Sequence, residues 1–511
     1  MSREKKTVAI IGSGFSGLCA AIRVKQELGI RATVFELSDN VGGTWHVNTY
    51  PGCACDIPVH LYSFSFELNS EWSQKYSPQA EIHEYLVRVV DKYRLRSQIK
   101  LNTEVISATW CEDLLQWKVE YRHKEDPPET KYFDIVFAGL GSLRIPKIPK
   151  QFTKFEGPTV HSAKWDPTID YSNKRIGIVG TGASAIQLTP ELQKIATNLV
   201  VFQRTPPWIF PKAQFNYSKL VQFIFRYFPF IMRLYRWYLF LGHEWFYYGF
   251  RDNNGILAKL GLRYFRRITA ETLTKAGRPD LIPIMTPNYA PGCKRIVRSD
   301  DYLQTMAKSN VNVVTSPIGN IQGNTIYTKD GQAYELDILV LATGFEIGKF
   351  GGNIKLYGRN NMDLTSYWRN HPPRTFKSTL VNDFPNMFIL FGPGTGLGHN
   401  SAIGIIESQV EYGIKMIKYM MDHRLDAMDP TRSAQKVYST RLVASFKDSV
   451  WQSGCRSFYK SIDGNIYSLW SGTVMSFWRE LKNTGFDTSF NYYRKALPPV
   501  EYSGEIGKTK L

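Results

Sequence analysis

The hydrophobic positions of this chain form two similar units, in each of which an apolar run meets a glycine-rich turn. Residues 8–11 (Val-Ala-Ile-Ile) precede the turn 12–17 (Gly-Ser-Gly-Phe-Ser-Gly), and residues 176–179 (Ile-Gly-Ile-Val) precede Gly-Thr-Gly-Ala-Ser-Ala at 180–185. A helical stretch follows each turn, and a second apolar run ends each unit. An apolar strand that enters a helix through glycines can bind a pyrophosphate, because backbone N–H groups and the helix N-terminus approach the phosphates closely. The pattern therefore predicts two dinucleotide sites.

The residue at the end of the second apolar run differs between the two units. Gly12 to Glu36 and Gly180 to Arg204 both span 24 residues, so Glu36 and Arg204 hold equivalent positions. A carboxylate there suits the hydroxyls of an unphosphorylated ribose, as in FAD, whereas an arginine suits a ribose 2′-phosphate, as in NADPH. The predicted cofactor-binding residues are Gly12, Gly14, Phe15, Ser16, Gly17 and Glu36 for FAD, and Gly180, Thr181, Gly182, Ala183, Ser184, Gln187 and Arg204 for NADPH.

Two further segments after the first unit are expected to contribute to the FAD side. Gly43 is one of a glycine pair that precedes Thr44 and Trp45, and paired glycines let the backbone pass close to a ligand. Residues 50–56 form a turn-rich segment with one acid, Asp56. We expect all four residues near the flavin.

The remaining pattern predicts how the two units are joined. Residues 78–93 have helical periodicity, residues 103–110 and 116–122 resemble a small antiparallel insertion, and the apolar run at 134–139 returns to the parallel sheet. Prolines stiffen the connector at 144–149. The predicted fold class is α/β with two Rossmann-like dinucleotide-binding domains and an aromatic-rich helical insertion. The predicted parts are residues 1–147 (FAD domain), 148–333 (NADPH domain, insertion about 208–285) and 334–511 (second part of the FAD domain and a substrate-side segment).

Residues 208–250 are rich in aromatic side chains, and Lys and Arg recur along one helical stripe from Lys219 to Arg236. Pro229 is expected to kink or divide this helix. A functional interpretation is an amphipathic segment that lies on a membrane or lines a path for a greasy substrate. The alternative, a helical insertion packed on its own domain, is preferred. Charges interrupt every 18-residue stretch, which argues against a transmembrane helix.

Composition narrows the class of protein. The chain has 511 residues, 43% of them hydrophobic, which fits two or three domains and excludes a disordered chain. The net charge of +18 could indicate nucleic acid or an anionic membrane. Because no basic run of five occurs, the preferred interpretation is that the cations serve phosphate-bearing cofactors and otherwise cover a solvated face. Six scattered cysteines without histidines at ligand spacing predict no metal site and reduced, intracellular thiols. The polar start leaves no room for a signal peptide, so a cytoplasmic protein is expected.

A doubled fold of this kind passes hydride from NADPH to a bound flavin, and the flavin then performs the chemistry. The reduced flavin could pass its electrons to one of three acceptors: a disulfide, an electron-carrier protein, or O₂. Reduction of a disulfide would need a C-x-x-C pair, which is missing. No distinctive sequence feature indicates reduction of an electron-carrier protein.

A stretch just before the second glycine turn resembles a known family. Its pattern F-x-G-x-x-x-H-x-x-x-W-D is similar to the fingerprint of type I Baeyer–Villiger monooxygenases, and its residues are Phe155, Gly157, His161, Trp165 and Asp166. Flavin monooxygenases that oxidise nitrogen or sulfur look similar but usually lack the Trp-Asp ending. Overall the chain resembles the fungal secondary-metabolism branch of the family.

The resemblance implies an NADPH-reduced FAD that captures O₂ as a C4a-peroxide and converts a ketone to an ester or lactone. Arg295 matches the catalytic arginine of the family, which stabilises anionic intermediates, and Asp56 matches its acidic partner. Lys294 and Thr205 join Arg204 as residues that grip the 2′-phosphate. His161 and Trp165 look structural, and Phe458 stands where some relatives carry an active-site tryptophan.

The expected partners are a small-molecule ketone and O₂, without nucleic acid or an obligate protein partner, and membrane contact through 208–250 is not expected. Two alternatives stay open: an N- or S-oxygenating or hydroxylating flavin monooxygenase of the same fold, and a non-catalytic NADP(H)-binding regulator.

Overall fold

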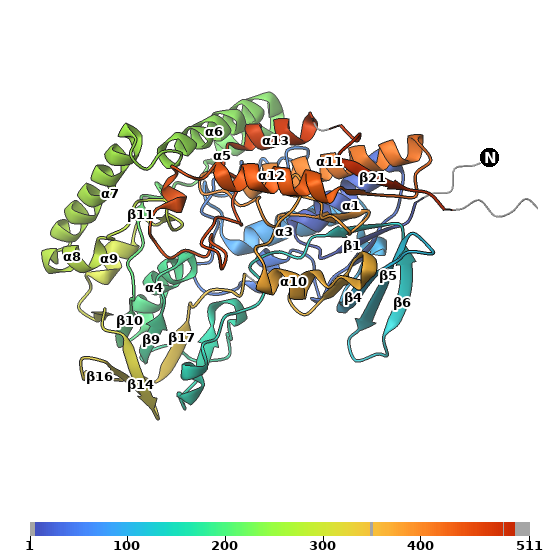
Figure 1. The fold of residues 1–511 in the computed structure, drawn as a ribbon. Coiled ribbons are helices and arrows are strands. Elements are labelled where there is room, and N and C mark those ends of the chain that lie inside the picture. The colour runs from blue at the N-terminus through green and yellow to red at the C-terminus, as the bar shows by residue number, and fades with distance from the viewer. Residues whose placement is uncertain (1–5, 348–350, 484, 496–511) are drawn as a thin grey trace, which may run out of the picture.

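The computed structural model describes residues 6–347, 351–483 and 485–495. Figure 1 shows two lobes, each built on a sheet, with the helices α5 (Lys219–Tyr227), α6 (Pro229–Phe250) and α7 (Ile256–Lys275) along the top and upper left.

The first lobe is organised by a five-stranded parallel sheet with the order β19-β7-β1-β2-β3. Val8 and Ile10 point to helices on one face, while Ala9 and Ile11 belong to a separate core on the other. This alternation follows from the two-residue period of a strand. The strands are β1 (Val8–Ile11), β2 (Thr33–Phe35), β3 (Ile99–Lys100), β7 (Ile135–Ala138) and β19 (Met387–Ile389).

Helices cover one face of this sheet and an antiparallel sheet covers the other. The helical face is formed by α1 (Phe15–Leu28), α3 (Gln79–Lys92) and α11 (Ala402–Asp422). The opposite layer has the order β18-β4-β5-β6, with bounds Lys355–Tyr357, Thr103–Cys111, Gln116–His123 and Glu129–Phe133. The predicted helix at 78–93, the antiparallel strands and the return of the chain at 134–139 are confirmed.

The second lobe repeats the design with a parallel sheet of order β13-β10-β9-β17-β8. The strands are β8 (Thr159–His161), β9 (Arg175–Val179), β10 (Asn198–Phe202), β13 (Val311–Val314) and β17 (Ile338–Leu341). Helices α4 (Ala183–Ile195) and α9 (Tyr302–Met306) pack on one face. The other face carries the antiparallel strands β14 (Ile318–Gln322), β15 (Thr325–Thr328) and β16 (Ala333–Glu335).

The predicted boundary at residue 333 is wrong. Strand β17 lies between β9 and β8 and pairs in parallel with both, so it belongs to the second sheet. The apolar run that forms β17 needs two strand neighbours to satisfy its backbone groups, and the second sheet supplies them. The chain returns to the first lobe only after β17.

The helical insertion bridges the two lobes. Phe225 of α5 and Met232 and Leu239 of α6 lie in the core of the first lobe, whereas Leu273 of α7 lies in the core of the second. Arg236 of α6 also donates hydrogen bonds to first-lobe groups, including the carbonyl oxygen of Ser63. The expectation that the insertion packs on its own domain therefore holds for α7 and is wrong for α5 and α6. Pro229 begins α6 and separates it from α5, as predicted.

The C-terminal part adds elements around the first lobe. They are α10 (Leu364–Asn370), β20 (Ala427–Pro430), α12 (Arg432–Ala444), α13 (Val474–Lys482) and β21 (Phe490–Tyr493), and β20 pairs with β21. Among the described residues, every helix is too short or too polar to span a bilayer. Within the same residues, no group of three His, Cys, Asp or Glu side chains could hold a metal ion.

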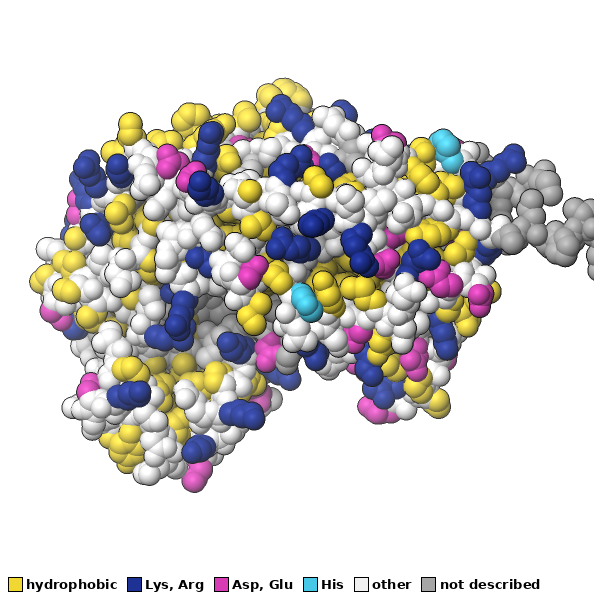
Figure 2. Space-filling model, in the orientation of Figure 1, with side chains coloured by type: hydrophobic (Ala, Val, Ile, Leu, Met, Phe, Trp, Pro, Cys, Tyr) yellow, Lys and Arg dark blue, Asp and Glu magenta, His cyan; other side chains and the backbone are white. Residues whose placement is uncertain are grey.

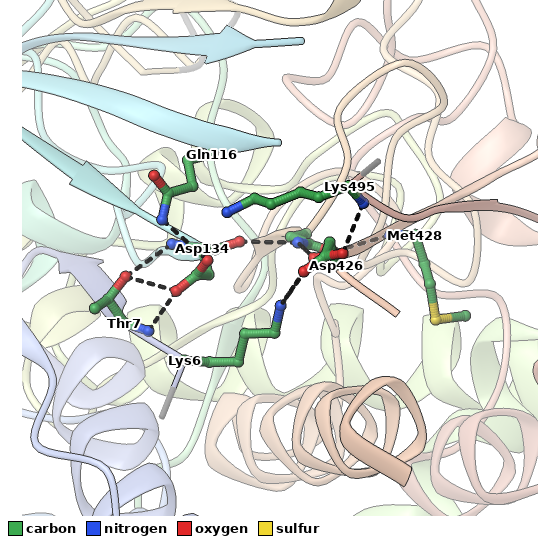
Figure 3. A network of polar contacts seen from close by, with 8 residues as sticks. Lys6, Thr7, Gln116, Asp134, Asp426, Met428 and Lys495 are labelled. Carbon is green, nitrogen blue, oxygen red and sulfur yellow. Dashed lines mark hydrogen bonds and ion pairs between the residues drawn. The ribbon is translucent and has the colours of Figure 1, made fainter. Parts of the chain in front are cut away.

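A polar network fastens the beginnings of β1 and β7 to the C-terminal part (Figure 3). Asp134 accepts hydrogen bonds from the backbone and hydroxyl of Thr7, at 2.7 and 2.8 Å, and from Gln116 at 3.1 Å. Asn386 donates to the carbonyl oxygens of Asp134 and Asp426, both at 2.9 Å. Burial raises the pKa of Asp134, and these hydrogen bonds lower it by more, so its carboxylate stays ionised.

The cysteines differ from the prediction of reduced thiols. Cys293 and Cys455 form a disulfide, whereas Cys19, Cys53, Cys55 and Cys111 are free. The two bonded cysteines are 162 residues apart, and only the fold brings them together.

Candidate active site

Two glycines of the first turn, Gly12 and Gly17, leave no space for a side chain. A Cβ on Gly12 would lie 2.6 Å from the carbonyl oxygen of Gly139, and the φ of Gly12 is +93°. A Cβ on Gly17 would lie 1.8 Å from the carbonyl oxygen of Gly12, and one on Gly43 would lie 3.0 Å from the Cα of Gly14. The close approach of Gly43 to Gly14, with a hydrogen bond of 3.0 Å from the N–H of Gly42 to the carbonyl oxygen of Ser13, holds the predicted segments 12–17 and 42–45 against each other. Helix α1 begins after Gly14, which has no side chain to cap its N–H groups, so the N-terminus suits a phosphate.

Glu36 is buried at the end of β2 and is held by backbone and hydroxyl groups. Its carboxylate accepts hydrogen bonds from the N–H and hydroxyl of Ser13, at 2.8 and 2.6 Å, and from the N–H of Ser38 at 2.8 Å. The carboxylate thereby sits beside the glycine turn. A buried acid in this position fits the ribose of an FAD.

The other predicted FAD residues lie around the same turn. Phe15 and Trp45 both pack edge-on against the ring of Tyr62, at 5.2 and 5.5 Å. Thr44 begins the short helix α2 (Thr44–Val47), and Ser16 lies in the first turn of α1. The structure thus brings these residues together at one edge of the first sheet.

The second glycine turn repeats the geometry of the first. A Cβ on Gly180 would lie 2.4 Å from the carbonyl oxygen of Ala342, whereas one on Gly182 would meet nothing within 4 Å. Helix α4 begins at Ala183, directly after Gly182, and Ser184 follows in its first turn. The hydroxyl of Thr181 donates to the carbonyl oxygen of Thr205 at 2.8 Å, which ties the turn to the end of β10. The turn is open where a pyrophosphate would approach.

Arg204 and Lys294 form a pair of cations beside this turn. Arg204 is exposed, and Lys294 is half-buried with its ammonium 4.8 Å from the ring centre of Tyr289. Burial, and then the charge of Arg204, lower the pKa of Lys294. Neither residue forms an ion pair with any described acid. Two cations that repel each other without a carboxylate between them fit an anion such as the 2′-phosphate of NADPH.

Gln187 of α4 connects the second lobe to the segment that carries Asp56. Its amide accepts a hydrogen bond from the hydroxyl of Tyr50 at 2.9 Å and donates to the carbonyl oxygen of Ala54 at 2.9 Å. Gly52 packs so closely that a Cβ there would lie 2.5 Å from the carbonyl oxygen of Gln187. Gln187 therefore positions the 50–56 segment, a role that its assignment to the NADPH site did not anticipate.

Asp56 and Arg295 form an ion pair between the two lobes. Nη2 and Nε of Arg295 donate to the same carboxylate oxygen of Asp56, at 2.6 and 3.1 Å. Burial raises the pKa of Asp56, but the charge and hydrogen bonds of Arg295 lower it by more. The Asp56 charge in turn raises the pKa of Arg295. Both groups are therefore charged at neutral pH, and Arg295 keeps Nη1 for another acceptor.

Tyr459 is a residue of this site that sequence reasoning missed. It is 3% exposed, and its hydroxyl is close enough to Arg295 and Asp56 for both charges to act on it. Burial raises the pKa of Tyr459 to about 12. Phe458, which the resemblance placed at an active-site position, is instead 50% exposed. The sequence held no signal for the choice between adjacent aromatic residues.

The Cys293–Cys455 disulfide fastens the segment that carries Tyr459 to the loop that carries Arg295. Cys293 lies two residues before Arg295, and Cys455 lies four before Tyr459. The disulfide therefore holds the segments that carry Arg295 and Tyr459 close to each other.

The fingerprint residue His161 acts at the junction of the lobes. Its Nδ1 accepts from the N–H of Ala163 at 3.1 Å, so Nε2 is left to donate to the carbonyl oxygen of Gly344 at 3.1 Å. Gly344 also accepts from the N–H of Lys147 at 2.8 Å. Burial lowers the pKa of His161, which favours this neutral form. His161 thus helps to hold together the segments around Lys147 and Gly344, which connect the two lobes.

The other fingerprint residues support the second lobe. Trp165 stacks on Tyr171 with ring centres 4.5 Å apart, and Asp166 accepts from the N–H and hydroxyl of Thr168 at 2.9 and 2.6 Å. Phe155 is buried, and a Cβ on Gly157 would lie 2.8 Å from its ring. None of these contacts involves Asp56 or Arg295, and the structural role of this stretch stays a prediction.

Comparisons with known proteins give the family. The family model described as flavin-binding monooxygenase-like matches residues 5–236. A Baeyer–Villiger monooxygenase of Pseudomonas aeruginosa is 38% identical over 504 residues, which cover 98% of this chain and 93% of that protein. An FAD-binding monooxygenase of Aspergillus niger, ktnD, is 34% identical over 499 residues, covering 93% of this chain and 80% of that protein.

A solved structure supports the same assignment. Cyclohexanone monooxygenase from Rhodococcus sp. Phi1, bound to NADP⁺, is 26% identical with a TM-score of 0.83, and the match covers 96% of this chain and 100% of that one. The glycine turns, the buried Glu36 and the Arg204–Lys294 pair fit the two cofactors. The chain therefore belongs to the Baeyer–Villiger monooxygenase family, and it is an FAD- and NADPH-dependent flavin monooxygenase.

Proposed function

We propose that this enzyme inserts one oxygen atom of O₂ beside the carbonyl of a bulky ketone to give an ester or lactone, with Arg295 and Asp56 as its catalytic pair. The observation that carries the proposal is the partly buried ion pair between these two residues, which spans the two lobes. FAD, when bound, would supply the activated oxygen. The aromatic content of the chain, 14%, is in keeping with a large apolar ketone.

Arg295 is suited to hold negative charge. Attack on a carbonyl moves charge onto the carbonyl oxygen, and a fixed cation in a site poor in water stabilises that charge most when it is already in place. Asp56 takes Nε and Nη2 of Arg295 and so fixes the plane of the guanidinium. Nη1 then remains for the developing oxyanion. Asp56 would otherwise be an unpaired negative charge where anionic species form, and the ion pair neutralises it.

The cofactor residues divide between the two lobes as proposed sites. Gly12, Gly14, Gly17, Glu36 and the 43–45 segment would hold FAD. Gly180, Gly182 and the 183–187 turn of α4 would hold the NADPH pyrophosphate, and Arg204, Thr205 and Lys294 its 2′-phosphate. Gln187 and His161 would fix the position of the two lobes relative to each other.

The test is the Arg295→Ala variant purified with its flavin. NADPH should still bleach the flavin absorbance, while ester formation from a ketone panel should fall by more than about 100-fold. Amines and sulfides in the same panel distinguish the N- or S-oxygenating alternative. A protein that oxidises only amines or sulfides would disprove ketone oxidation, and a protein purified without flavin would support a non-catalytic regulator.

We also infer that the chain belongs to the fungal secondary-metabolism branch of the family. The Aspergillus niger relative supports this placement. The Pseudomonas aeruginosa relative is more similar and bacterial, so the branch stays a proposal. Identifying the genes that lie beside its own gene in the native host would test the placement. A host without neighbouring biosynthetic genes would contradict it.

A cytoplasmic location is part of the same proposal, because NADPH and O₂ are both present there. Fractionation of native cells tests it, and recovery of the protein only from the culture medium would contradict it.

A further inference from the structure

The helix α6 exposes an apolar stripe on the side that faces away from the protein. The outer face of α6 consists of Phe230, Leu234, Trp237, Leu241, Trp245 and Tyr248, which are between 43% and 68% exposed. Their spacing of three or four residues places them on one side of the helix. The opposite side, with Met232, Leu239 and Phe250, is buried. The helix α6 is therefore apolar on both sides, whereas a helix on the surface of a soluble protein normally presents polar residues outward.

The neighbouring helices extend this surface. Leu220 and Phe223 of α5 are 67% and 54% exposed, and Ile256 and Leu260 of α7 are 77% and 51% exposed. Figure 2 shows hydrophobic and cationic side chains gathered along the upper edge, where Figure 1 places these helices. Contiguous exposed apolar surface of this kind marks a site of interaction rather than an ordinary protein exterior.

Cations accompany the exposed apolar residues. Residues 219–275 contain ten Lys and Arg but only three acids, Glu244, Asp252 and Glu271. Glu244 faces inward, where it accepts hydrogen bonds from the N–H groups of α13. Arg233, Lys259 and Arg263 are exposed and form no ion pair with any described acid. The surface therefore carries a clear positive charge.

We propose that the outer face of α6, with α5 and α7, docks on the surface of an anionic lipid bilayer. Apolar helix faces rich in Trp, Tyr and Phe and flanked by Lys and Arg bind at the boundary between headgroups and acyl chains. The cations would pair with anionic headgroups, each contributing favourably near the membrane surface. A second copy of the chain fits this surface less well, because a two-fold interface would place like cations against each other.

This placement puts the bilayer on one side of α6 and the proposed active site on the other. Phe250, on the inner side, packs against Gly292, whose Cβ position lies 2.4 Å from its ring, and Gly292 lies three residues before Arg295. An α-helix is about 10 Å across. A ketone dissolved in the bilayer would therefore be one helix away from the segment that carries Arg295. This consequence depends on the proposed function, whereas docking itself does not.

Vesicle co-sedimentation of the flavin-loaded enzyme tests the proposal. We expect it to bind vesicles of phosphatidylcholine with about 30% phosphatidylserine, to bind pure phosphatidylcholine at least about tenfold more weakly, and to dissociate in about 0.5 M NaCl. Leu241→Glu with Trp245→Glu should weaken binding about tenfold or more while the flavin spectrum and NADPH-dependent bleaching stay unchanged.

The matched control is Val437→Glu with Ile462→Glu. These residues are 67% and 83% exposed but lie outside the insertion, so binding should be unchanged. Wild-type enzyme that fails to bind anionic vesicles would overturn the proposal. So would equal loss of binding in the control, or a dimer in light scattering that the Leu241→Glu, Trp245→Glu variant separates. None of these measurements uses ester formation, so they are independent of the proposed function.

Discussion

A single carboxylate oxygen of Asp56 accepts both hydrogen bonds from Arg295, at 2.6 Å from Nη2 and 3.1 Å from Nε. Asp56 belongs to the first lobe, and Arg295 lies just before β12 (Val297–Arg298) in the second lobe. Lys294, the preceding residue, is close enough to Arg204 for that charge to lower its pKa, and both belong to the proposed NADPH site. The pair thus connects the lobe that would hold FAD to the loop that would hold NADPH.

Asp56→Asn should lower ester formation. The amide keeps the shape of the side chain but removes the charge that orients Arg295. We expect ester formation to fall about 10- to 100-fold, while flavin reduction by NADPH changes little. Steady-state product formation and stopped-flow flavin bleaching measure the two separately. Asp113→Asn, in an exposed turn between β4 and β5, is the control and should match the wild type.

The same carboxylate should affect stability at acid pH. The pKa of Asp56 in the folded protein lies below its ordinary value of about 3.9. A depressed folded pKa stabilises the protein above the unfolded pKa, and this contribution is lost as the pH falls through about 4 toward the folded pKa. Between about pH 6 and 3, the free energy of unfolding should therefore decrease less in Asp56→Asn than in the wild type. Identical pH profiles would show that the ion pair does not contribute to folding.

The cation pair predicts how the enzyme selects its nucleotide. Replacing Arg204 or Lys294 with Ala removes one partner of the 2′-phosphate, so the preference for NADPH over NADH in kcat/KM should drop about 10- to 100-fold. The change should arise mainly in KM. Lys329→Ala, an exposed cation beside β15, should retain the wild-type ratio. A wild-type enzyme that uses NADH as well as NADPH would refute the assignment.

Gly12→Ala should damage the FAD site. The new methyl would meet the Gly139 carbonyl oxygen at 2.6 Å in a backbone conformation with φ of +93°. We expect a loss of about 1–3 kcal/mol in the free energy of unfolding from the strained backbone alone, together with a low flavin-to-protein absorbance ratio. Gly261→Ala is the control. A Cβ there meets nothing within 4 Å in helix α7, so it should stabilise the protein slightly. Full flavin content in Gly12→Ala would contradict the predicted cradle.

The disulfide gives a direct chemical prediction. Thiol titration of the denatured protein should find four free cysteines, and six after reduction. Cys455→Ser should destabilise the protein by about 2–4 kcal/mol and expose the 453–470 segment to limited proteolysis. Cys111→Ser, which affects a free thiol, should do neither. Six free thiols without reduction would rule out the bond in the purified protein.

Local patterns were sufficient to predict much of the fold. The two glycine turns, the tip residues Glu36 and Arg204 and the helix break at Pro229 follow from spacing and backbone geometry alone. They were predictable because each depends on residues near one another in the sequence, where chain sterics and strand period dictate the outcome.

What the sequence did not predict depends on contacts between distant residues. The Cys293–Cys455 bond joins positions 162 residues apart, and Tyr459 approaches Arg295 only because the C-terminal segment folds back. Strand β17 was assigned to the wrong lobe because an apolar run does not reveal which sheet it will join. The packing of α5 and α6 on the first lobe was missed for the same reason.

The most direct test of the central claim compares Arg295→Ala with Arg295→Lys in flavin-loaded enzyme given NADPH, O₂ and the ketone that the wild type converts. We expect normal bleaching of the flavin in both variants, ester formation lowered by more than about 100-fold in Arg295→Ala, and at most partial ester formation from Arg295→Lys, whose ammonium cannot make both hydrogen bonds to Asp56. Ester formation by Arg295→Ala at the wild-type rate would contradict the claim.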